Sequence, residues 1–113
     1  MSQNKERFGA CNLRIVAGKA PEALEPLPAP DRVFIGGSGG NMTRIMQVAL
    51  EKNPQVRFVI TAVTLETIGD VLSSFKDLQL VNVEMVQANI SRDRKAGPYH
   101  LMTAENPVYI MSA

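Results

Sequence analysis

A short apolar strand that runs directly into a cluster of glycines constrains the fold of this chain more than any other feature. Residues 33–35 are apolar, four of the five residues 36–40 are glycine, and a helical pattern begins at Asn41. In an open α/β sheet, ligands bind beyond the carboxyl ends of the strands, where such loops lie. Glycine lets the backbone approach a ligand closely and adopt positive φ. The run therefore predicts a ligand at the end of a strand, or else a tight strand-to-helix turn without one.

The spacing of these glycines excludes two common nucleotide motifs without naming the ligand. The phosphate-binding loop of nucleotide hydrolases requires a lysine directly after its glycines, and no lysine follows the glycines here. The order of the glycines also differs from G-x-G-x-x-G, the dinucleotide fingerprint.

Length and composition predict a single domain over residues 1–113, 45% hydrophobic and with a net charge of +1. This small charge favours neither nucleic acid nor a membrane surface as a partner. No apolar run approaches the roughly 18 residues of a membrane span, and the polar start is not a signal peptide, so we expect a cytoplasmic protein. The single cysteine, Cys11, allows no internal disulfide and is expected to be partly buried. No His/Cys cluster has metal-ligand spacing, so we expect no metal site.

Strand and helix patterns alternate through the first two thirds of the chain. Pro21 suits the first turn of a short helix, and Thr64 can cap a later one. The alternation predicts a largely parallel sheet in a three-layer α/β arrangement. The expected strands are 13–17, 32–36 and 56–63, and the expected helices are 20–24, 41–52 and 65–75.

The last third of the chain predicts an antiparallel hairpin at one edge of that sheet. Residues 81–90 alternate imperfectly, as in a strand, and residues 91–98 are charged and suit an exposed loop. A returning strand covers 99–111 and is interrupted near Asn106–Pro107, because proline lacks the donor that the ladder needs.

Four segments carry a resemblance to a known family. Residues 18–24, 30–40, 62–67 and 104–108 resemble, in order and spacing, the precorrin-6Y methyltransferases that methylate C15 and decarboxylate C12 in cobalamin biosynthesis. The resemblance covers nearly the whole chain. It implies a class I methyltransferase fold, which is Rossmann-like, with S-adenosylmethionine as methyl donor. It also implies a precorrin, a tetrapyrrole, as substrate and a homo-oligomeric assembly.

The chain departs from this family at its beginning and at Lys19. The family's first strand with its glycine-rich loop, and the strand whose terminal acid binds ribose, have no counterpart here. Residues 4–9 resemble the end of the helix that follows those strands, so the chain resembles the C-terminal portion of the enzyme. Relatives usually carry an aspartate acceptor near adenine where Lys19, a donor only, stands here.

The resemblance also implies which residues form the site, and the loops that carry them converge at one edge of a doubly wound sheet. The catalytic residues stay unknown. Positioning should supply most of the effect in methyl transfer to an electron-rich carbon, and the macrocycle can act as the electron sink for decarboxylation. The implied cofactor-binding residues are Gly18, Lys19, Ala20, Gly36 and Gly37. The implied substrate-binding residues are Ser38, Gly39, Gly40, Asn41, Thr61 and Thr64.

Three functions remain open from the sequence. The first is a precorrin methyltransferase that is active once its N-terminal part is supplied, on a substrate with or without cobalt. The second is a non-catalytic remnant or assembly module of that enzyme. The third is an unrelated α/β ligand-binding domain that shares only the glycine loop. The basic residues Arg92, Arg94 and Lys95 predict either a solvated loop or a contact with carboxylates of a corrin precursor, and His100 is expected to be exposed or structural.

Overall fold

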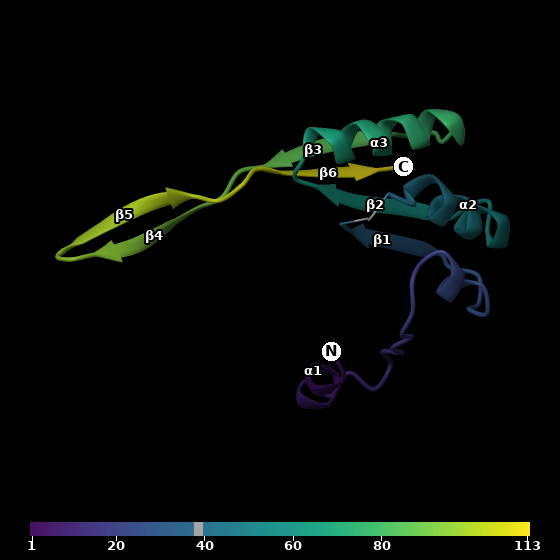
Figure 1. Cartoon of the computed structure of the whole chain (residues 1–113), viewed down its shortest axis with the longest axis horizontal. Coiled ribbons are helices and arrows are strands. Elements are labelled where there is room, and N and C mark those ends of the chain that lie inside the picture. Colours follow the sequence, from purple (N-terminus) through teal and green to yellow (C-terminus); the bar gives the residue numbers. More distant parts are fainter. Residues whose placement is uncertain (38–39) are drawn as a thin grey trace.

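The computed structural model describes residues 1–37 and 40–113, and Figure 1 shows the arrangement of their helices and strands. A mixed four-stranded sheet carries two helices, and a separate two-stranded ribbon projects from one end of it (Figure 1). The elements are α1 (Ser2–Arg7), the 3₁₀ turn η1 (Glu22–Leu24), β1 (Arg32–Gly36), α2 (Met42–Lys52), β2 (Arg57–Ala62), α3 (Leu65–Asp77), β3 (Glu84–Ala88), β4 (Ser91–Ala96), β5 (Tyr99–Ala104) and β6 (Val108–Ser112).

The sheet order is β1-β2-β6-β3, which leaves β1 at one edge. β1 and β2 are parallel, with Ile35 opposite Ile60, as the βα alternation predicted. β6 is antiparallel to both β2 and β3, so the expected antiparallel pair at the end of the chain is confirmed. The carboxyl ends of β1 and β2 therefore lie at the same end of the sheet, where the glycine loop begins.

Both α2 and α3 pack on one face of this sheet. Alternate residues of β2 point toward the helices, and Phe58 and Ile60 are completely buried there. Met46 from α2 and Phe75 from α3 join the same core cluster. The Oγ1 of Thr43 and the Oγ of Ser74 are 2.6 Å apart, which adds a hydrogen bond between the two helices. At the start of α3, the hydroxyl of Thr64 accepts from the Thr67 amide, as predicted for a capping residue.

The opposite face of the sheet is uncovered, and the expected third layer is absent from the described residues. We call this surface the open sheet face and define it by Phe34, Val59, Val86 and Ile110. Phe34 lies opposite Val59, and Val86 lies opposite Ile110, so the four side chains share one face. Phe34 is 68% exposed and Val59 is 37% exposed. The three-layer expectation was wrong because no helix in residues 1–37 or 40–113 packs on this face.

Residues 13–17 were expected to form a strand, and this was wrong. They belong to no strand in the described part of the chain, and Leu13, Ile15 and Val16 remain partly exposed. An alternating pattern forms a strand only when a neighbour satisfies its backbone groups. Cys11, just before this segment, is exposed rather than partly buried for the same lack of a covering layer.

Two further expectations also differ from the structure. The helix expected over 20–24 is the shorter 3₁₀ turn η1, because the following prolines stop it. The loop expected over 91–98 is instead β4 and a two-residue turn at Gly97 and Pro98. Gly97 has a φ of +61°, which suits the first central position of a hairpin turn. The ladder between β4 and β5 begins with Ser91 opposite Ala104 and ends with Ala96 opposite Tyr99. Residues 105–107 separate β5 from β6, where the interruption near Asn106–Pro107 was expected.

The helices of the described residues are all too short or too polar to cross a membrane.

Candidate functional site

A cavity of about 400 Å³ lies at the carboxyl end of β1. Gly36 and Gly37 line it, together with Lys19 and Ala20 from the preceding connector. We call it the glycine cavity. Its volume lies within the range of about 300–1,000 Å³ that is typical of small-molecule sites. Its remaining lining residues are Leu24, Val33, Phe34, Ile35, Asn41 and Ile45.

The connector that follows Lys19 and Ala20 is held in place by the C-terminal end of α2. The Nζ of Lys52 donates hydrogen bonds to the backbone oxygens of Leu24 (2.9 Å), Glu25 (2.8 Å) and Leu27. A lysine ammonium has three donors, so this turn uses all of them. The Nδ2 of Asn53 donates to the Pro30 oxygen at 2.8 Å and fixes the end of the same connector.

Glycine is required at two positions beside this cavity for different reasons. Gly18 has a φ of +144°, and a Cβ atom there would lie only 2.9 Å from the Cβ of Ala23. Gly37 has a φ of +74° but no atom within 4 Å of a Cβ position, so its limit is conformational rather than steric. The expected positive φ in the glycine run is therefore confirmed at Gly37 and at Gly40.

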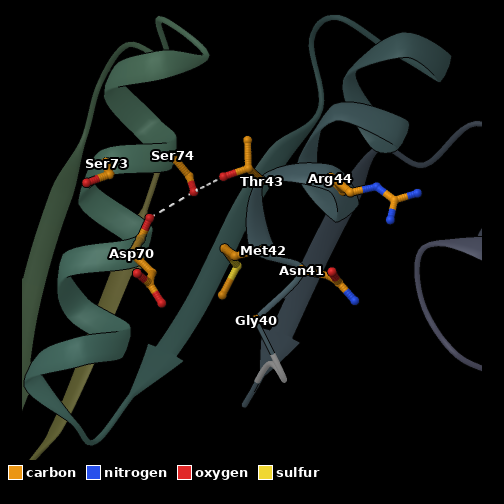
Figure 2. A pocket seen from close by; sticks show the side chains of 8 residues that line it. All are labelled: Gly40, Asn41, Met42, Thr43, Arg44, Asp70, Ser73 and Ser74. Atoms are coloured by element: carbon orange, nitrogen blue, oxygen red, sulfur yellow. Dashed lines mark hydrogen bonds between the residues drawn. The ribbon is translucent and has the colours of Figure 1, made fainter.

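A second, more polar cavity of about 210 Å³ lies between the start of α2 and the middle of α3 (Figure 2). Figure 2 shows Thr43, Ser74 and the Asp70 backbone joined by hydrogen bonds along one side of it. The Oγ of Ser74 donates to the Asp70 oxygen at 2.8 Å. Asn41, at the start of α2, lines both cavities. The full lining is Gly40, Asn41, Met42, Thr43, Arg44, Asp70, Ser73 and Ser74.

The structure brings most of the expected cofactor-binding residues together. Lys19, Ala20, Gly36 and Gly37 share the glycine cavity, and Gly18 adjoins it through the turn to Ala23. These assignments came from two segments that are separated by the proline-rich connector in the sequence.

The expected substrate-binding residues are more dispersed. Asn41 and Gly40 line the second cavity, and Ser38 and Gly39 lie outside the described residues. Thr61 lies opposite Gly36 across β1 and β2, on the open side of the sheet.

Thr64 lines neither cavity. Its hydroxyl donates to the Thr67 Oγ1 at 2.8 Å and accepts from the Thr67 amide at 3.1 Å. This threonine is therefore occupied in capping α3.

Sequence reasoning missed Lys52 and Asp70. Lys52 is an ordinary basic residue in the last turn of a helix, and its carbonyl partners lie 25–28 positions earlier in the chain. Asp70 lies in the middle of α3, where no motif distinguishes it from a solvated helix residue. Neither position carries a local pattern that would have found it.

The charge around the glycine cavity is cationic. Lys19 is the one ionisable residue among its lining residues in the described part of the chain, and no carboxylate lines it. Lysine donates hydrogen bonds but accepts none. Within residues 1–37 and 40–113, no group of three His, Cys, Asp or Glu side chains is arranged to hold a metal ion.

Replacing Lys52 by methionine is expected to loosen the connector while α2 stays folded. The variant keeps the aliphatic stem, which packs beside Leu24 and Leu27, but leaves three backbone oxygens without their donor. Leaving such groups unsatisfied costs about 1–3 kcal/mol. Amide exchange at Ala23, Leu24 and Leu27 should become faster.

The matched control for this change is Lys76→Met, which removes an exposed lysine from the last turn of α3. It should leave the exchange of the connector amides unchanged. Equal acceleration in both variants would show that Lys52 has no specific role in holding the connector.

Comparisons with known proteins give a consistent result. A family model described as a precorrin methyltransferase domain matches residues 1–113. A probable cobalt-precorrin-6B C(15)-methyltransferase (decarboxylating) of Pyrobaculum calidifontis is 38% identical over 112 residues, which are 98% of this chain and 57% of that protein. The crystal structure of precorrin-6y C5,15-methyltransferase from Geobacter metallireducens matches with a TM-score of 0.87 and 35% identity, over 98% of this chain and 59% of that one.

A more distant match bears on the fold alone. A SAM-dependent O-methyltransferase from Thermotoga maritima matches with a TM-score of 0.62 at 13% identity, over 98% of this chain and 43% of that one. The mixed sheet with parallel β1 and β2 therefore corresponds to part of a class I methyltransferase fold. The chain spans less than two thirds of the length of each of these relatives.

Proposed function

We propose that this chain, which belongs to the precorrin methyltransferase domain family, forms the C-terminal part of an S-adenosylmethionine-dependent C15-methyltransferase (decarboxylating) of cobalamin biosynthesis. The observation that carries this proposal is the convergence of two separate loops, at Lys19–Ala20 and Gly36–Gly37, on one cavity at the carboxyl end of β1. The family match over the whole chain supports the reaction type, and the names of the relatives supply the substrate class, a precorrin.

The glycine cavity fits an adenosyl group in size and in the close approach that Gly36 and Gly37 allow. It fits the adenine amino group less well, because Lys19 offers no acceptor. When bound, S-adenosylmethionine supplies an electrophilic methyl group on a sulfonium. In this proposal Gly18, Ala20 and Gly37 shape the pocket by their backbone, and the Lys52 hydrogen bonds fix the connector that follows Lys19 and Ala20.

The substrate side of the proposal rests on residues that follow the strands. Asn41 lines both cavities, and its side-chain amide provides both a donor and an acceptor for a substrate. Gly40 and Thr61 lie near the same end of the sheet, and Ser38, Gly39 and Thr64 are assigned here by family resemblance. The proposed contribution of these residues is orientation, which is worth roughly 7–11 kcal/mol in well-aligned reactions.

The test of the proposed function is an activity assay on a joined protein. The N-terminal two fifths of the Geobacter relative would be fused to this chain, because the chain corresponds to about 59% of that protein. Transfer of a labelled methyl group to cobalt-precorrin-6B and to its cobalt-free counterpart would be measured together with CO₂ release. Methylation of either substrate is expected, and the active one identifies the cobalt requirement.

The N-terminal segment alone is the control and should be inactive. A folded fusion that binds S-adenosylmethionine but methylates neither substrate would refute the substrate assignment. A folded fusion that does not bind the cofactor would refute the methyltransferase function as a whole.

The open sheet face favours the assembly module as the second candidate function. Phe34 and Val86 are largely exposed there, and large apolar patches on one face mark interaction sites. In this alternative the chain docks through that face on further polypeptide and contributes no chemistry. The enzyme proposal also includes a homo-oligomer, since the family resemblance implies one and the uncovered face gives it a contact surface.

A further inference from the structure

The ribbon formed by β4 and β5 projects from the same end of the sheet as the candidate site. In Figure 1 the arrowheads of β1 and β2 point toward the ribbon, and the chain enters it after β3 and leaves it into β6. The molecule measures 56 Å along its longest axis and 22 Å along its shortest. In Figure 1 the ribbon extends beyond the carboxyl ends of β1 and β2, and the glycine cavity lies at the carboxyl end of β1.

The pairing register separates the ribbon into two different faces. Residues directly opposite each other share a face, and faces alternate along each strand. Arg92 pairs with Thr103, Arg94 with Leu101 and Ala96 with Tyr99. We call this the arginine face. The other face carries Ser91, Asp93, Lys95, His100, Met102 and Ala104.

The charges of the two faces are balanced differently. On the second face, the Nδ1 of His100 lies 3.1 Å from the Oδ2 of Asp93, so that carboxylate already has a partner. Arg92 and Arg94 form no salt bridge with any residue in the described ranges 1–37 and 40–113. They lie two positions apart on one strand face, which places their Cα atoms about 6.5–7 Å apart. At that spacing, both guanidiniums can contact one ligand that carries several carboxylates.

The same face also offers an apolar surface between and beside the arginines. Tyr99 is 70% exposed and Leu101 is 48% exposed. A guanidinium binds a carboxylate through two parallel hydrogen bonds, and its plane stacks on flat π systems. A surface with two free guanidiniums, an aromatic ring and a leucine suits a ligand that is flat in the middle and carboxylated at its rim.

We propose that the arginine face of the ribbon binds the carboxylate side chains of the tetrapyrrole substrate. Arg92 and Arg94 hold two of the carboxylates, while Tyr99 and Leu101 pack against the edge of the macrocycle. This inference rests on the proposed function, because it takes the substrate class from it. It assigns substrate recognition to a segment outside both cavities, which then hold the reacting centre and the cofactor.

The test uses uroporphyrin I, a flat tetrapyrrole with eight carboxylates, as a fluorescent probe for the 113-residue chain. The double variant R92Q/R94Q removes both guanidiniums from the ribbon. The matched control, R32Q/R57Q, removes two exposed arginines that also face each other across paired strands. We expect the ribbon variant to weaken binding about tenfold or more and the control to change it less than about twofold, since each lost charged contact is a strong one.

A second variant, Tyr99→Ser, separates packing from charge. It should weaken uroporphyrin binding but leave the binding of a small tricarboxylate such as citrate unchanged. Circular dichroism and thermal melting of each variant verify that the sheet remains folded. The ribbon makes no contribution to the buried core, so the melting temperatures are expected to stay close to that of the unmodified chain.

Three results would overturn the proposal. Equal weakening in R92Q/R94Q and R32Q/R57Q would reduce it to general charge attraction. Unchanged binding in the ribbon variant would place the carboxylate contacts elsewhere. A change in molecular mass by light scattering, confined to the ribbon variant, would make the ribbon a contact between copies of the chain.

Porphyrin binding does not report methyl transfer, so failure of this proposal and failure of the proposed function are distinguishable. Ribbon-dependent uroporphyrin binding together with an inactive fusion protein would leave the binding surface intact and remove the enzymatic role. An active fusion whose KM for precorrin is unaffected by R92Q/R94Q would keep the enzymatic role and refute substrate binding by the ribbon.

Discussion

S-adenosylmethionine titrated into the 113-residue chain is expected to give no saturable heat at low micromolar concentrations. The glycine cavity has no carboxylate among its lining residues to accept from the ribose hydroxyls, and Lys19 cannot accept from adenine. Each missing hydrogen bond removes roughly 0.5–1.5 kcal/mol, and more where a charge is involved. The loss of three or four of them changes the dissociation constant by about a thousandfold, from micromolar to millimolar.

The control titration uses the chain fused to the N-terminal segment of the Geobacter relative, which is expected to bind in the micromolar range. Low-micromolar binding by the 113-residue chain alone would contradict the prediction. Light scattering on the same sample would then show whether a single chain or an assembly of chains completes the site.

The second large effect is expected from Phe58→Ala, which should destabilise the fold by about 3–5 kcal/mol. The Phe58 ring is 0% exposed and lies in the core cluster between the sheet and the two helices. The backbone of Phe58 makes reciprocal hydrogen bonds with Ala113 at 2.9 and 3.1 Å, and these remain in the variant. The loss therefore reports the side chain alone. Since small domains are stable by only about 5–15 kcal/mol, urea denaturation should show a large shift in midpoint.

Val59→Ala is the matched control, because Val59 is next to Phe58 in the strand and its side chain points to the open sheet face. Val59 is in the same strand but partly exposed, so its truncation should cost about 1 kcal/mol or less. Similar losses at Phe58 and Val59 would mean that the open sheet face is buried in solution. That result would indicate a stable assembly through this face.

The sequence predicted those elements whose stability is local or whose partner lies close in the chain. The spacing in 41–52 and the cap at Thr64 describe α2 and α3 within about one or two residues at each end. The strands at 32–36 and 56–63 are apolar enough to be recognised without their partners. The pairing of β1 with β2 followed from the helix between them.

Errors arose where an element depends on a distant partner. Residues 13–17 have a strand-like pattern but no neighbour to pair with, while residues 91–96 are highly charged yet pair with β5. Charge indicated exposure correctly there, but exposure does not exclude a strand in a two-stranded ribbon. The third layer was inferred from the usual coverage of parallel sheets, which the described residues do not supply.

The candidate site divides in the same way. The glycine loop and the Lys19–Ala20 segment were found from sequence because close backbone approach requires particular residues. The hydrogen bonds of Lys52 to the connector and the cavity beside Asp70 depend on tertiary geometry, so no spacing rule predicts them. The cap of α3 uses the Thr64 hydroxyl, and the assignment of Thr64 to the substrate stays a prediction.

The position of β1 links sheet assembly to ligand affinity. Among the described residues, this strand is an outer member of the sheet and pairs with another strand on one side only, and its carboxyl end also lines the glycine cavity. A strand added along the other side would lengthen the sheet and enclose the cavity in a single event. By thermodynamic reciprocity, a ligand that binds the enclosed cavity more tightly must strengthen the association of the added strand by the same factor. Cofactor concentration would then set how completely the protein is assembled.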